Sequence, residues 1–174
     1  AGAGSLDLDG NDAGQINAVA GSVSTLTHTL SAWVRTTATN RPTFLAANTS
    51  SGGNSNMLFI TGGASATAQA FSDPPGSFVA VAGAPVVNDD AWHHIAWVKD
   101  GTDGELYVDG MLRAMTNQAN YVRTPTDLWS LGQEFDGDSL GDFWTGQIDD
   151  VQIYDEALTS DQIDFLFNNP GQVF

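Results

Sequence analysis

Hydrophobic and polar residues alternate in short runs along most of the chain. The clearest run spans 26–35, where Leu30 and Val34 fall on one face of an extended strand. A second run spans 92–99 and is followed, after an Asp-Gly loop, by 105–108, which predicts a β-hairpin. This alternation is typical of a sheet with one buried face.

Shorter runs of the same kind lie between turn-forming residues in the rest of the sequence, which contains 19 glycines. Further strands are expected at 5–9, 15–19, 43–46, 57–61, 78–82, 128–132 and 147–154. The stretches 48–56 and 73–76 are rich in Gly, Ser, Asn and Pro, which predicts surface loops. Strands at this spacing predict an all-β sandwich.

One segment near the end of the chain indicates a helix. Thr159 and Gln162 have the spacing of a capping box, and Ile163 and Leu166 supply an apolar face. Asn-Asn-Pro-Gly at 168–171 then ends the helix. We therefore expect a β-sandwich of two antiparallel sheets with one short C-terminal helix.

Charge and composition exclude several classes of partner and of site. Five basic residues against 21 acidic ones give a net charge of −16, so we expect no nucleic acid as partner and no membrane insertion. The acidity either serves solubility or reflects carboxylates that converge on a divalent metal. The absence of cysteine excludes disulfides and thiolate zinc sites.

The 174 residues fit one domain, 1–174. The opening Ala-Gly-Ala-Gly looks like a linker, so we expect a module cut from a larger chain with flanking domains.

Several segments occur in an order that resembles a known family: 5–10, 26–34, 92–98, 106–110 and 146–154, followed by Ala-Leu-Thr at 157–159. This ordered set is similar to the concanavalin A-like superfamily, specifically its laminin G-like and pentraxin branches. The resemblance implies a jelly-roll β-sandwich and a calcium-dependent lectin.

The segment 131–136, Leu-Gly-Gln-Glu-Phe-Asp, resembles the pentraxin calcium motif. The resemblance implies that Glu134 and Asp136 are carboxylate ligands and that the carbonyl of Phe135 coordinates between them. An earlier Asp-Asn pair of the family is matched here by Asn-Ser-Asn at 54–56. Asn54 would then offer an amide oxygen in place of a charge, which lowers the expected affinity for calcium.

The residues themselves also suggest a metal. Glu134, Asp136, Asp138 and Asp142 fall within nine residues, interleaved with glycines. Such carboxylates repel one another unless a cation or solvent separates them, and calcium takes six to eight oxygen ligands. The alternative is an exposed, solvated acidic loop. The predicted Ca²⁺ ligands are Glu134, Phe135, Asp136, Asn54, Asp138 and Asp142.

Most tryptophans should belong to the core, but Trp144 and Phe143 follow the acidic loop and are expected to flank a bound glycan. The predicted ligand contacts are Asn54, Asn56, Phe143, Trp144 and Tyr121. His93 and His94 point to opposite faces of a strand, so we interpret them as structural residues and not as a joint metal site.

An enzyme is the less favoured hypothesis. The laminarinase-like branch of the superfamily carries Glu-x-Asp-x-x-Glu, and Ser139 stands here where the acid would be. The sequence thus predicts a calcium-dependent, non-catalytic carbohydrate-binding module of a bacterial surface adhesin or secreted protein, located outside the cell. A protein-binding or structural laminin G-like module is the alternative.

Overall fold

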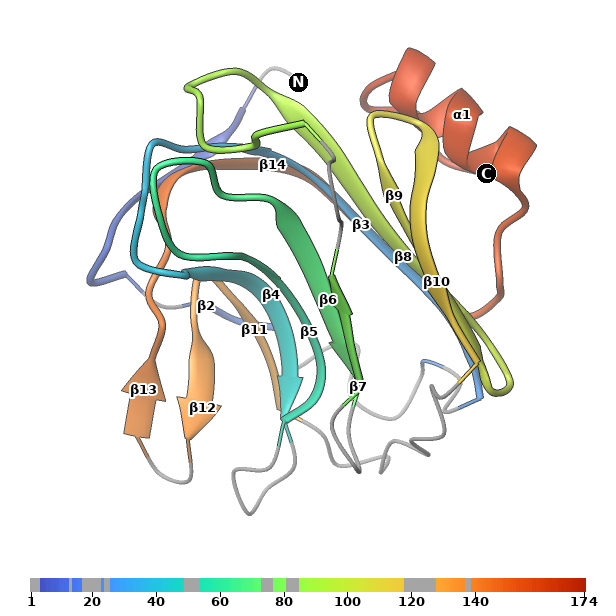
Figure 1. Cartoon of the computed structure of the whole chain (residues 1–174), viewed down its shortest axis with the longest axis horizontal. Helices are drawn as coiled ribbons and strands as arrows, with labels where there is room; N and C mark the ends of the chain where they lie inside the picture. Colours follow the sequence, from blue (N-terminus) through green and yellow to red (C-terminus); the bar gives the residue numbers. More distant parts are fainter. Residues whose placement is uncertain are drawn as a thin grey trace.

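Two antiparallel sheets of six strands each lie face to face (Figure 1). The computed structural model describes residues 4–12, 14–16, 23, 26–48, 54–72, 77–80, 85–117, 128–136 and 139–174. Sheet A contains, in spatial order, β1 (Leu6–Asp9), β14 (Thr145–Tyr154), β3 (Thr27–Arg35), β8 (His93–Asp100), β9 (Asp103–Val108) and β10 (Met111–Thr116). Sheet B contains β2 (Gly14–Gln15), β11 (Leu128–Leu131), β4 (Thr43–Asn48), β5 (Asn54–Ile60), β6 (Ala68–Ser72) and β7 (Ser77–Ala80).

The main hydrophobic core fills the space between the two sheets. Leu30, Ile95 and Leu106 contribute from sheet A, and Leu58 and Trp129 contribute from sheet B. Burying these faces against each other is the main favourable term in forming the sandwich. The predicted jelly-roll β-sandwich with a short C-terminal helix is confirmed.

The helix α1 (Ser160–Asn168) covers the outer face of sheet A (Figure 1). Thr159 caps it as predicted: its Oγ1 accepts from the Gln162 amide, and the Gln162 side chain accepts from the Thr159 amide. Ile163 and Leu166 pack with Ala96, Val98 and Tyr107 in a second buried cluster.

This second layer corrects one expectation about the strand at 26–35. We predicted one buried face, but β3 is buried on both faces from His28 to Val34. The outer face is buried because α1 and the segment before it pack onto it, which strand periodicity does not reveal.

The structure also differs from the predicted loops. β4 continues to Asn48 and β5 begins at Asn54, both inside the stretch 48–56 expected to be a surface loop. The pairing of Asn48 with Asn54 extends both strands, because ladder hydrogen bonds outweigh the weak strand propensity of asparagine. β6 and β10 were not predicted.

Within the part of the chain that the structure describes, no helix is long and apolar enough to cross a membrane.

Candidate functional site

The predicted calcium motif forms a small hairpin and not the glycine-rich loop that we expected. β12 (Glu134–Asp136) pairs with β13 (Ser139–Gly141), and β12 packs against β4 and β5 of sheet B. Figure 1 shows this hairpin at the lower left of the sandwich. The motif therefore sits on a strand fixed to the sheet, where side-chain directions are set by the pleat.

Gly132 positions the hairpin. Its amide donates to the carbonyl of Phe44, and its own carbonyl accepts from the Trp144 amide (2.8 Å), so the chain is held just before and after the hairpin. Its φ is +74°, and an added Cβ would lie 2.4 Å from Cδ1 of Leu8. Only glycine combines this backbone conformation with such close packing.

Asn48 connects the end of β4 to the motif. It is fully buried, and its Nδ2 donates to the carbonyl oxygen of Phe135 at 3.0 Å. Ser130 adds a second link, because its Oγ donates to the carbonyl of Gln133 at 2.8 Å. Neither residue was predicted; the only signal for Asn48 was that no turn residue separates it from the strand 43–46.

Glu134 is only 5% exposed, although it carries a carboxylate. Burying a carboxylate is costly unless hydrogen bonds or a cation compensate it. Glu134 and Asp136 are two positions apart in β12. Both predicted carboxylate ligands therefore belong to one short strand.

The residues around Glu134 fit calcium only with the help of uncharged oxygens. No group of three or more His, Cys, Asp and Glu side chains capable of holding a metal was found among the described residues. Calcium also accepts amide and backbone oxygens, however. Gln133, next to Glu134, is 1% exposed, and its Oε1 has no hydrogen-bond partner within the described ranges. Phe135 keeps one carbonyl lone pair, since Asn48 occupies the other.

The remaining predicted site residues fall into three groups. Asp142 is half-buried at φ +46°, and its carbonyl accepts from the Thr43 amide, so it lies at the base of the hairpin. Phe143 is half-buried beside it. Asn54, Asn56 and Asp136 are described only by their backbone pairing, and Asp138 and Tyr121 lie outside the described residues.

The prediction that Trp144 contacts a ligand is wrong. Its side chain is 0% exposed and packs edge-on against Phe44, with ring centroids 5.4 Å apart. Trp144 belongs to the core between the sheets, because the chain turns inward where the hairpin ends and β14 begins. Trp33, Trp97 and Trp129 are buried too, as predicted for most tryptophans.

Ser139 has an environment unlike that of a catalytic serine. The sequence 137–141, Gly-Asp-Ser-Leu-Gly, has the spacing of a nucleophile elbow, in which a serine lies on a turn from a strand into a helix. Here Ser139 is an exposed residue of β13, paired with Asp136 across the hairpin. All three histidines lie in β3 or β8, in the opposite sheet.

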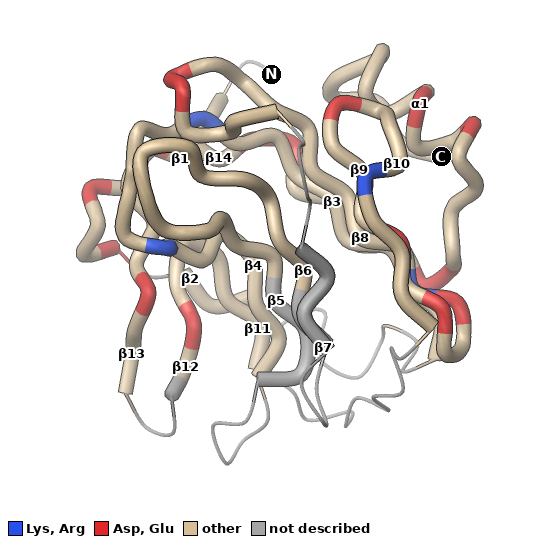
Figure 2. The backbone as a smooth tube through the Cα atoms, viewed as in Figure 1, with Lys and Arg blue, Asp and Glu red and all other residues tan. Residues whose placement is uncertain are grey.

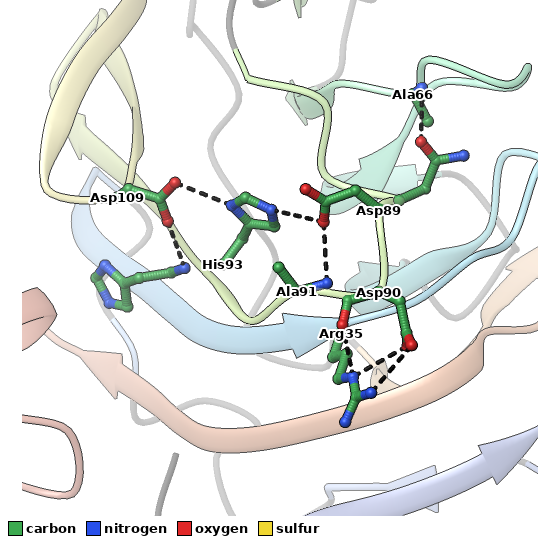
Figure 3. Close-up of polar contacts among 9 residues, drawn as sticks. Arg35, Ala66, Asp89, Asp90, Ala91, His93 and Asp109 are labelled. Carbon is green, nitrogen blue, oxygen red and sulfur yellow. Dashed lines mark hydrogen bonds and ion pairs between the residues drawn. The ribbon is translucent and has the colours of Figure 1, made fainter.

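A separate polar cluster surrounds His93, which we call the His93 clasp: Asp89, His93 and Asp109 (Figure 3). The Nδ1 atom of His93 lies 2.9 Å from Oδ2 of Asp109, and Nε2 lies 3.2 Å from Oδ1 of Asp89. The hydrogen bond and the charge of Asp109 raise the pKa of His93, with a smaller contribution from Asp89. The clasp joins the β9–β10 turn to the loop before β8.

His94 has the opposite environment on the other face of β8. Its ring lies 5.5 Å from that of Trp33 and 6.4 Å from that of Phe167. Burial lowers the pKa of His94 to about 4, because the charged form is desolvated there. The two imidazoles do not meet at one metal, as the sequence predicted.

Acidic residues occur in the hairpin, the β8–β9 turn and α1, whereas basic residues are few and scattered (Figure 2). The acidic residues behind the net charge of −16 are therefore spread over several elements.

Comparisons with known proteins identify the family to which this architecture belongs. A laminin G-type family model, described as the concanavalin A-like lectin/glucanases superfamily, matches residues 8–164. A search of curated proteins finds no match.

Solved structures share the fold at low sequence identity. Domain 4 of AbnA, a GH43 extracellular arabinanase from Geobacillus stearothermophilus, in complex with arabinotriose, has 21% identity, a TM-score of 0.73 and coverage of 93% of this chain and 75% of that chain. The CBM40 of the Ruminococcus gnavus IT-sialidase, bound to α2,3 sialyllactose, has 16% identity, a TM-score of 0.77 and coverage of 94% and 96%. A SAP-like pentraxin from Limulus polyphemus has 17% identity, a TM-score of 0.68 and coverage of 82% and 70%.

Proposed function

The chain belongs to the concanavalin A-like lectin/glucanase superfamily, and we propose that it is a calcium-dependent carbohydrate-binding module without catalytic activity. The observation that carries the proposal is the hairpin β12–β13, in which the strand that contains Glu134 and Asp136 packs against sheet B. The two similar structures that contain oligosaccharides support the glycan as ligand.

Each residue of the site has a defined task in this proposal. Glu134 and Asp136 supply charge, and the carbonyl of Phe135 and amide oxygens such as that of Asn54 complete the ligand set. Asn48 and Ser130 hold the hairpin so that these oxygens keep their places. Bound calcium would supply a positive centre that coordinates vicinal sugar hydroxyls, and Phe143 would pack against the sugar.

The geometry of the hairpin also supports the proposal that the module has no catalytic activity. A glycosidase needs two carboxyl groups at a defined separation across the scissile bond. Ser139 stands where the laminarinase-like pattern has its last acid, and it lies in the neighbouring strand β13 and not further along β12. This module would act within a secreted or surface-attached protein, where repetition supplies avidity.

Thermal unfolding tests the proposal. Calcium at 100 times its dissociation constant should stabilise the fold by about 2.7 kcal/mol, which raises the melting temperature by roughly 5–10 °C. A sugar of the correct class should raise it further, and only when calcium is present. Glu134→Gln keeps the size of the buried side chain and should abolish both shifts, whereas Glu156→Gln, an exposed residue before α1, should not.

The result that contradicts the proposal is a melting temperature that calcium and chelator leave equal. The hairpin would then hold no calcium, and only the fold would remain.

A specific feature favours a protein-binding module as the second candidate. The edge strand β10 exposes Met111 (60%) and Met115 (67%), and Met115 lines a pocket of about 460 Å³ with Asp103 and Glu105. Exposed methionines on a strand that forms the edge of the sheet, as far as the structure describes the chain, are suited to receiving a peptide strand. A protein that binds peptides and binds no glycan would favour this candidate.

A further inference from the structure

A polar pocket lies where β3 ends and β14 begins, away from the hairpin β12–β13. Its volume is about 270 Å³, and its lining consists of Arg35, Thr36, Thr37, Asp90, Thr145, Gly146 and Gln147. None of these residues belongs to the hairpin or is among the predicted calcium ligands. The pocket therefore requires its own explanation.

The wall of the pocket is a row of planar polar groups on the outer face of sheet A. Gln147 pairs in register with Arg35 on one side and with Asp7 on the other, so the three side chains share a face. Arg35 donates from Nε and Nη2 to the carboxylate of Asp90 at 3.0 Å (Figure 3). Nη1 of Arg35 and the side-chain amide of Gln147 have no hydrogen-bond partner among the residues that the structure describes.

The loop that carries Asp90 is fixed by its own hydrogen bonds. Asn88 is buried; its Oδ1 accepts from the Ala66 amide, and its Nδ2 donates to the carbonyls of Ala38 and Gly63. Asp89 accepts from the Ala91 amide (Figure 3), and the Asp90 amide donates to the carbonyl of Thr36.

These bonds hold Asp90 at φ +67°, a conformation uncommon for residues other than glycine. The carboxylate is thus in place before any ligand arrives, which reduces the entropy lost on binding.

The floor of the pocket is kept open by Gly146. Its φ is +133°, and an added Cβ would lie 2.2 Å from the carbonyl oxygen of Arg35, so no side chain can grow there. Thr36 fixes the floor from the other strand, because its Oγ1 donates to the carbonyl of Thr145 at 2.6 Å. Thr37 and Thr145 are exposed and leave hydroxyl groups at the rim.

The chemistry of the lining defines the ligand. The charges of Arg35 and Asp90 cancel, and the protein as a whole carries −16, so an anion is disfavoured. A guanidinium, a carboxylate and an amide each can form two hydrogen bonds to adjacent hydroxyl groups. The volume lies just below the range of about 300–1,000 Å³ typical of pockets for drug-sized ligands, which suits a single sugar ring.

We propose that this pocket binds one neutral sugar unit and does so without calcium. The proposal adds a second position to the proposed carbohydrate binding and rests on a different set of residues. No aromatic residue lines the pocket, so hydrogen bonds alone would hold the sugar. A dissociation constant in the millimolar range is expected for a ligand with about 12 non-hydrogen atoms.

The experiment is a ¹H–¹⁵N NMR titration of the full chain in the presence of chelator. The probes are D-galactose and D-glucose, each compared with its uronic acid. We expect the neutral sugars to shift the side-chain signals of Arg35 and Gln147 and the amides of 145–147, and the uronic acids to bind more weakly. Gln147→Ala and Thr37→Val should each weaken binding about fivefold, because each removes one hydrogen bond. Gln69→Ala, in sheet B, should leave it unchanged.

Three results would overturn the proposal: no shift at the pocket with either neutral sugar, binding that Gln147→Ala leaves unchanged, or tighter binding of the uronic acids. The chelator separates this test from that of the hairpin site. If calcium later produces no shifts at Glu134–Asp136, the hairpin proposal fails and the pocket stands. Failure of the pocket alone leaves the calcium-dependent site untouched.

Discussion

Replacing Asp109 by asparagine tests the His93 clasp. Asp109 lies in the β9–β10 turn at φ +54°, a conformation that asparagine tolerates well. Its Oδ1 accepts from the His94 amide, which an asparagine oxygen can still do, whereas its Oδ2 contacts His93. The substitution therefore removes the negative charge beside His93 and places an amide NH2, which can only donate, where Oδ2 lies.

The magnitude follows from the burial of the pair. The side chain of His93 is 10% exposed and that of Asp109 25%, so solvent screens the pair only in part. Hydrogen bonds to charged groups contribute about 1.5–3 kcal/mol net. We expect Asp109→Asn to cost about 1.5 kcal/mol at pH 6, which corresponds to a melting temperature lower by roughly 3–6 °C.

The cost should depend on pH in one direction. The pKa of His93 in the folded protein is raised above its usual value of 6.5, so its stabilisation is complete below pH 6.5 and is lost as the pH rises through the folded pKa. Once the pH has risen above the folded pKa, the imidazole is neutral in both states, and the cost should fall to about 0.5 kcal/mol.

Urea unfolding followed by tryptophan fluorescence between pH 6 and 9 measures this dependence. Asp89→Asn is the control, since Asp89 is 48% exposed and lies further from the ring, and it should have a smaller effect. A cost of Asp109→Asn that is the same at every pH would refute the argument that charge holds the clasp.

Three further variants test the packing around the sites. The pKa of His94 is lowered to about 4, so on acidification the unfolded chain binds the proton before the folded protein does, and His94 should cost about 3 kcal/mol of stability between pH 6.5 and pH 4. His94→Phe keeps the contact with Trp33 and should abolish this loss, which urea unfolding at both pH values checks. Gly132→Ala should cost about 2 kcal/mol of stability. Gly171→Ala should cost less, because Gly171 also has a positive φ but an added Cβ would meet no atom there; the melting temperatures of the two variants test this difference. Trp144→Ala should cost about 3–5 kcal/mol by chemical denaturation, and Phe143→Ala about 1 kcal/mol, and equal costs would contradict the assignment of Trp144 to the core.

The strands with strong alternation were predicted well. The run 26–35 corresponds to β3, and the run 92–99 to β8, within a residue at most boundaries. Thr159 and Gln162 predicted the start of α1 because a capping box is a local interaction. β6 and β10 were missed because their alanines, methionines and polar residues have weak strand propensity and depend on pairing with a neighbour.

The candidate site was predicted less completely. The sequence singled out the segment Glu134–Asp136 as a proposed calcium motif, but Asn48 comes from a distant strand, and no sequence spacing connects it with Phe135. Trp144 was misassigned because its neighbours in sequence are acidic, whereas its neighbour in space is Phe44. The pocket beside Arg35 was not foreseen at all.

By itself the sequence determined the fold class, the capped helix, the excess of acidic charge and the segment that carries the carboxylates. These depend on residues close together in the chain, whose periodicity and charge act locally. Only the tertiary structure decided which carboxylate is buried, which tryptophan is core, and that Arg35, Asp90 and Gln147 line one pocket. Those outcomes depend on strand pairing and on the packing of one layer against another, which bring together residues that are far apart in sequence.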